Sequence, residues 1–101
     1  MNPALTSIPH QWRSTTHISL SSAANFLGRA QAADGYDDVI DYAVEAVLCL
    51  AHILHTFNGR LAMKEVCEGI DTAQRHNPDF ESHFEAAQQA IRCGIREEVL
   101  A

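Results

Sequence analysis

The chain has 101 residues, the size of a single domain. Thirteen Asp and Glu residues against seven Lys and Arg give a formal net charge of −6, which argues against a duplex-binding surface, because basic side chains must replace the counterions of the phosphates. With 47% hydrophobic and 20% charged residues, the composition is that of a globular domain and excludes a disordered chain.

Targeting and redox signals in the sequence favour a cytoplasmic protein. We expect no secretory leader, since no apolar run follows a basic start. The apolar stretch 46–59 is too short to cross a bilayer, which takes about 20 residues. Cys49, Cys67 and Cys93 are odd in number, far apart and set among apolar neighbours, so we expect reduced, buried thiols.

Residues 1–19 are predicted to form a non-helical, apolar N-terminal arm. Pro3 and Pro9 oppose a regular helix, because proline lacks an N–H group and restricts the residue before it. The arm nevertheless carries large apolar side chains, including Ile8 and Trp12. We expect it to pack either on its own bundle, with Trp12 as a lid, or on a partner, with Trp12 as an anchor.

The first predicted helix spans 20–34. Apolar residues recur at helical spacing from Leu20 to Ala30, and Phe26 widens this stripe. Ser19 or Ser21 is expected to cap the N-terminus. Gly35 is expected to end the helix in a left-handed conformation.

The second predicted helix, 37–57, is the most apolar. Asp37 and Asp38 lie in its first turn, where carboxylates favour the positive end of the helix dipole. Apolar residues then cover most of its surface, so the helix must be nearly surrounded. The other helices of one chain are expected to leave part of it uncovered. This predicts a homodimer whose interface includes Val47, Leu50 and Leu54.

Two further helices complete the predicted fold. Asn58-Gly59 is interpreted as a tight reversal with positive φ, followed by a helix over 60–76. Asn77-Pro78-Asp79 indicates a helix stop and a new start, with the last helix reaching about residue 99. The prediction is a single all-α domain: a compact four-helix domain, 20–101, with short αα-hairpin links and the N-terminal arm.

The candidate catalytic and metal-ligating residues form no recognisable motif. His52 and His55 are spaced i, i+3, with Glu45 further back, yet neither HExxH nor the Glu-x-x-His pairs of di-iron bundles occur. A carboxylate near Cys49, from Glu45, would raise its pKa and oppose a thiolate nucleophile. We therefore expect no enzyme, no cofactor and no metal, and interpret the histidines as a polar edge of a buried helix.

The acidic block is the more informative feature. Between Arg29 and Arg60 there is no Lys or Arg, while Asp34, Asp37, Asp38, Asp41 and Glu45 contribute five negative charges. Such a block can be a solvated helix face, partly explained by the helix dipole. It can also steer association with a basic partner.

Three segments give the chain an overall layout. These are the arm ending at His17-Ile18-Ser19-Leu20, the acidic DGYDDVIDY at 34–42 and the apolar AVLCLAHIL at 46–54. This layout resembles the small helical bacterial quorum-sensing antiactivators of the QslA type. The resemblance implies a homodimer that binds the ligand-binding domain of a LuxR-type transcription regulator and blocks the regulator's dimerisation.

The sequence therefore predicts a non-enzymatic regulatory module that binds a protein, and contacts neither nucleic acid nor a membrane directly. Its expected contacts are apolar anchors from the arm and the first helix, and acidic residues that steer the partner. The anchors are Ile8, Trp12, Ile18 and Phe26, and the steering residues are Asp37, Asp38 and Asp41. Two alternatives remain: a phage-type inhibitor or nucleic-acid mimic that occupies a basic groove, and a small metal-binding helical protein.

Overall fold

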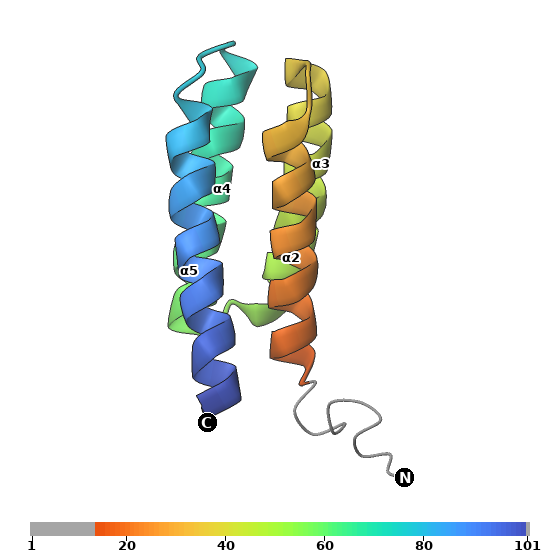
Figure 1. Ribbon diagram of the computed structural model, residues 1–101. Helices are drawn as coiled ribbons and strands as arrows, with labels where there is room; N and C mark the ends of the chain where they lie inside the picture. The colour runs from red at the N-terminus through yellow and green to blue at the C-terminus, as the bar shows by residue number, and fades with distance from the viewer. Residues whose placement is uncertain (1–13, 101) are drawn as a thin grey trace, which may run out of the picture.

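The computed structural model describes residues 14–100 and shows four helices with a short 3₁₀ turn (Figure 1). The elements are α2 (Thr15–Ala32), α3 (Tyr36–Leu50), η2 (Ala51–Ile53), α4 (Phe57–Gln74) and α5 (Phe80–Leu100). The predicted all-α, four-helix class is confirmed, and the described residues contain no strand. Most of the predicted arm, residues 1–13, lies outside the described residues, and the prediction that 15–19 are non-helical is wrong.

The helices form two antiparallel hairpins, α2–α3 and α4–α5, which lie side by side (Figure 1). One apolar stripe from each helix faces the centre of the bundle. The largest fully enclosed side chains are Leu20, Leu27, Leu50, Ile53, Val66, Phe84 and Ile91. Within residues 14–100, no helix is both long enough and apolar enough to span a bilayer.

Helix α2 begins five residues before its predicted start because Ser14 caps it. The Ser14 hydroxyl accepts a hydrogen bond from the His17 N–H at 3.0 Å and donates one to Glu98 of α5 at 2.6 Å. Ser19, a predicted cap, is instead buried within the helix. A capping hydroxyl satisfies an otherwise unpaired N–H group, and Ser14 also ties the start of α2 to the end of α5.

The predicted continuous helix over 37–57 is wrong. Helix α3 ends at Leu50, the chain tightens into η2, and the reversal occurs just before α4. Thr56 stabilises this reversal, since its hydroxyl accepts from the Gly59 N–H and donates to the Ile53 carbonyl, both at 2.9 Å. Asn58 and Gly59 are therefore buried in the first turn of α4 and do not form the turn itself.

The glycines at these turns do not adopt the positive φ that was predicted for them. Gly35 has φ −120° and is the N-cap of α3, and no described glycine has positive φ. Gly59 is needed for space, because a Cβ there would collide with the Ile53 carbonyl oxygen. The left-handed residue is His76, with φ 55°. It forms a Schellman end to α4, in which the N–H groups of His76 and Asn77 donate to Ala73 and Thr72.

Candidate protein-binding surface

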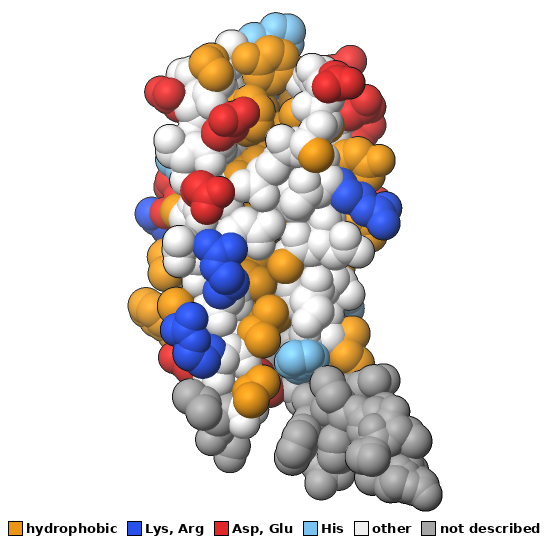
Figure 2. Space-filling model, viewed as in Figure 1, with side chains coloured by type: hydrophobic (Ala, Val, Ile, Leu, Met, Phe, Trp, Pro, Cys, Tyr) orange, Lys and Arg blue, Asp and Glu red, His pale blue; other side chains and the backbone are white. Residues whose placement is uncertain are grey.

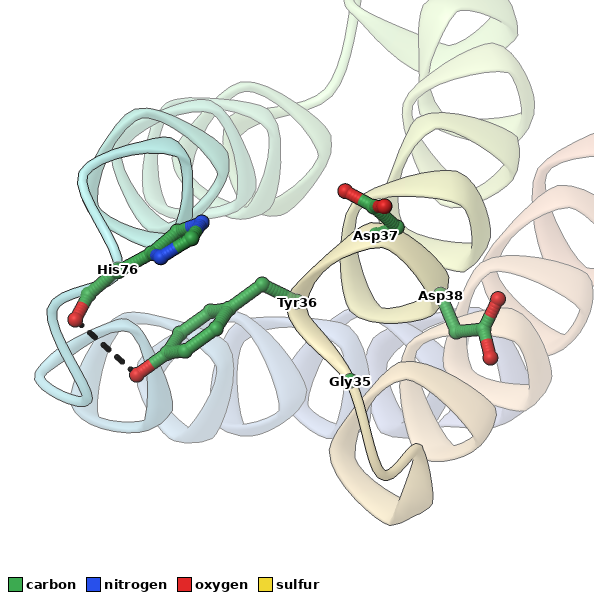
Figure 3. A pocket seen from close by; sticks show the side chains of 5 residues that line it. All are labelled: Gly35, Tyr36, Asp37, Asp38 and His76. Atoms are coloured by element: carbon green, nitrogen blue, oxygen red, sulfur yellow. Dashed lines mark hydrogen bonds between the residues drawn. The ribbon is translucent and has the colours of Figure 1, made fainter.

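One end of the bundle has an open hollow beside the α2–α3 turn, lined by Gly35, Tyr36, Asp37, Asp38 and His76 (Figure 3). The Tyr36 ring stacks on the His76 imidazole with centroids 4.6 Å apart and planes 3° apart. The Tyr36 hydroxyl also donates to the His76 carbonyl oxygen at 3.1 Å. These contacts join the α2–α3 turn to the end of α4 and hold His76 in its left-handed conformation.

The carboxylates of this hollow do not converge on a reaction centre. Figure 3 shows the Asp38 carboxylate pointing away from the stacked Tyr36–His76 pair and the Asp37 carboxylate pointing in a different direction, and both residues are exposed. Their place in the first turn of α3 is favourable because the helix N-terminus carries partial positive charge. The arrangement offers negative charge to an approaching molecule and no paired acid and base.

The same charge continues along the solvent side of α3. Asp37, Asp41 and Glu45 are exposed at intervals of one helical turn, and none of them forms a salt bridge within residues 14–100. Helix α3 contains no Lys or Arg. No basic side chain of α3 therefore neutralises the negative charge of its carboxylates.

Two large apolar side chains stand exposed on this helix. Val44 is 42% exposed and Leu48 is 56% exposed, and their four-residue spacing places them on one side of α3. We call Asp37, Asp41, Val44, Glu45 and Leu48 the α3 face. Its N-terminal half is acidic and its C-terminal half is largely apolar.

A groove between α2 and α3 extends the apolar half of this face. Ile18, 52% exposed, lines it from α2, while Glu45, Leu48 and His52 line it from α3 and η2. The structure thus places the predicted anchor Ile18 in the same groove as the unpredicted Leu48. The sequence signal for Leu48 was its position one turn after Val44, on the side of the helix that also carries Asp41.

The other predicted anchors do not join the groove. Phe26 is half-buried, packs against the core and lies under the Arg29 guanidinium, 5.8 Å from the ring centroid. Ile8 and Trp12 lie outside the described residues. The predicted steering residues Asp37, Asp38 and Asp41 are all exposed on α3.

The predicted homodimer interface does not form a continuous exposed surface. Leu50 is fully enclosed in the core of its own chain, so its side chain is not presented to a second copy. Val47 is half-buried against that core, and Leu54 is 43% exposed in the turn before α4. Leu50 was misassigned because the four helices of one chain cover the inner side of α3. Homodimerisation itself stays a prediction.

The three cysteines are free thiols in different surroundings. Burial raises the pKa of the Cys49 thiol, and the nearby Glu45 carboxylate raises it further, which confirms the predicted direction. Cys67 and Cys93 are exposed, so their predicted burial is wrong. Cys67 follows Val66 along α4, and Val66 takes the core position.

His52 and His55 do not share one face of a continuous helix. His52 lies in η2 and His55 in the turn that follows, and both are exposed. A different group of potential ligand atoms gathers elsewhere: Glu65 and Glu68 on α4 with His83 on α5. Sequence spacing shows the two glutamates at i, i+3, but the hairpin that brings His83 beside them could not be derived from spacing alone.

No family model, curated protein or solved structure matches this chain. Its function therefore has to be argued from the surface just described.

Proposed function

We propose that this chain is a non-enzymatic regulatory protein that binds and inhibits a protein partner through the α3 face. One observation carries the proposal: exposed Val44 and Leu48 lie beside carboxylates that have no salt-bridge partner among the described residues. An apolar patch rimmed by charge of one sign is typical of an interaction surface. The complementary partner presents an apolar depression rimmed by Lys or Arg.

The two halves of the face have separate roles. Burying Leu48 and Ile18 removes apolar surface from water and contributes affinity, at about 25 cal/mol per Å². Asp37 and Asp41 on this face, together with the neighbouring Asp38, steer a basic partner and select against acidic ones. The face seen in Figure 2 differs, because it carries basic as well as acidic side chains.

The partner class comes from the resemblance to quorum-sensing antiactivators. We propose a LuxR-type transcription regulator, bound through its ligand-binding domain, with inhibition by occlusion of the surface through which the regulator dimerises. In this proposal the antiactivator works as a homodimer in the cytoplasm, and Ile8 and Trp12 add contacts from the arm.

The direct test is binding to the purified ligand-binding domain of a LuxR-type regulator, measured by isothermal titration calorimetry. Leu48→Ser should weaken binding at least about tenfold, because loss of a buried interface anchor typically costs 2 kcal/mol or more. Val99→Ser is the matched control, since Val99 is 68% exposed on α5, away from the α3 face. Equal losses in the two variants would contradict the assignment of the surface.

A second candidate function rests on the acidic block alone. Asp34, Asp37, Asp38, Asp41 and Glu45 are all exposed in the α2–α3 turn and on α3. A nucleic-acid mimic that fills a basic groove would use this charge as its main source of affinity. Its binding should weaken steeply with salt, whereas apolar occlusion should hold or strengthen. A titration series in rising sodium chloride separates the two.

A further inference from the structure

We infer that Glu65, Glu68 and His83 form a binding site for a divalent transition metal ion, with Zn²⁺ the best match. The three side chains come from both helices of the α4–α5 hairpin, and their ligand atoms all lie within 4.8 Å of one another. His83 Nδ1 lies 3.0 Å from Glu65 Oε1 and 3.5 Å from Glu68 Oε1.

These separations suit tetrahedral coordination. Zinc binds imidazole nitrogen and carboxylate oxygen at about 2.0–2.2 Å, which places neighbouring ligand atoms of a tetrahedron about 3.3–3.6 Å apart. The distance from His83 Nδ1 to Glu68 lies in this range, and the distance to Glu65 is somewhat shorter. Coordination therefore needs side-chain adjustments that bring all three ligand atoms, which lie within 4.8 Å of one another, to these separations.

The hairpin itself brings the imidazole to the carboxylates. Gly69 lies one turn after Glu65, and a Cβ at that position would press into the Phe84 ring and come within 3.2 Å of the His83 Cβ. The missing side chain allows α5 to approach α4 closely at this level. Glu65 and His83 are also partly buried, with side chains 18% and 31% exposed, which limits their rotamers.

The donor set selects the type of metal. One imidazole with two carboxylates suits zinc and its neighbours in the first transition row, while Mg²⁺ prefers an all-oxygen octahedral shell. Three protein ligands leave a fourth position for water or for a group from a bound molecule. Without metal, His83 pairs with both glutamates and the Lys64 ammonium lies 3.6 Å from Glu68 Oε2. Lys64 is 64% exposed and can turn into water when a cation binds.

The test is calorimetric titration of the full chain with zinc sulfate after chelator treatment, with magnesium as the comparison ion. We expect one zinc per chain and no magnesium binding. Zinc at about 100 times its Kd should also raise Tm by roughly 10 °C or more. No zinc binding and no change in Tm would overturn the inference.

Variants identify the ligands. His83→Ala and Glu65→Gln should each weaken zinc binding at least about tenfold, which is the lower range for loss of even an indirect metal contact. His52→Ala is the matched control, because His52 is exposed and lies outside the cluster. Circular dichroism checks that each variant keeps its helices. Binding that survives in both His83→Ala and Glu65→Gln would overturn the assignment.

The free thiols supply a second, spectroscopic test. Cobalt bound by Glu65, Glu68 and His83 should lack a thiolate-to-cobalt charge-transfer band. A strong band of that kind would place the metal on Cys49, Cys67 or Cys93 and contradict the proposed site.

Discussion

At the scale of single residues, the reactivity of each cysteine thiol reports its local environment. Burial and the Glu45 carboxylate both raise the pKa of Cys49, so less of its reactive thiolate forms near neutral pH. Cys67 and Cys93 are exposed. Alkylation followed by mass spectrometry should therefore label Cys49 last at neutral pH, and Glu45→Gln should speed its labelling. Cys49 reacting as fast as Cys67 would contradict the structure.

Replacing glycine by alanine should have opposite effects on stability at two helical positions, Gly28 and Gly69. At Gly28 of α2 a Cβ meets nothing within 4 Å, so Gly28→Ala should stabilise the fold by about 0.5–1 kcal/mol through helix propensity. At Gly69 the Cβ would overlap the Phe84 ring, and Gly69→Ala should destabilise by about 1–3 kcal/mol. Urea denaturation of both variants measures the difference. A stabilising Gly69→Ala would show that α4 and α5 are less closely packed.

At the scale of helices and turns, Thr56 fixes the boundary between α3 and α4. Thr56→Ala removes the N-cap of α4 and the hydrogen bond to the Ile53 carbonyl. The free energy of unfolding should fall by about 1 kcal/mol. Thr15→Ala is the control, since Thr15 is an exposed residue at the start of α2, where Ser14 already supplies the cap. Equal stability of the two variants would contradict the capping role.

Helix spacing in the sequence predicted the elements better than it predicted their ends. Leu20, Ala23, Leu27 and Ala30 were expected in one stripe and are all buried. The apolar residues on both sides of Leu50, from Val47 to Leu54, concealed the break that follows it. Thr56 was the available signal, as a hydroxyl residue three positions before a glycine that approaches the backbone closely.

The candidate surfaces could be predicted only where one helix supplies them. Asp37, Asp38 and Asp41 follow one another along α3, so their exposure could be read from spacing. The groove of Ile18 and Leu48 joins two helices, as does the cluster of Glu65 and His83. Such pairings depend on which helix faces meet in the bundle, and helical periodicity does not specify that.

At the scale of the whole molecule, the acidic charge of α3 bears on its choice of partner. Two copies pairing through their α3 faces would bring Asp41 and Glu45 of each copy toward like charges, which opposes association. A basic partner removes this repulsion. We therefore expect the predicted homodimer to use a surface other than the α3 face. Leu54→Asp should shift the mass measured by light scattering toward that of the monomer. Leu48→Asp should leave this mass unchanged.

In the proposed function, binding at the α3 face and dimerisation of the regulator exclude each other. Sedimentation velocity of a LuxR-type ligand-binding domain, with and without an excess of this chain, measures both at once. We expect the regulator dimer to disappear as a complex containing one regulator subunit forms, and we expect the dimer to persist when Leu48→Ser replaces the original chain. A complex that retains an intact regulator dimer would contradict occlusion.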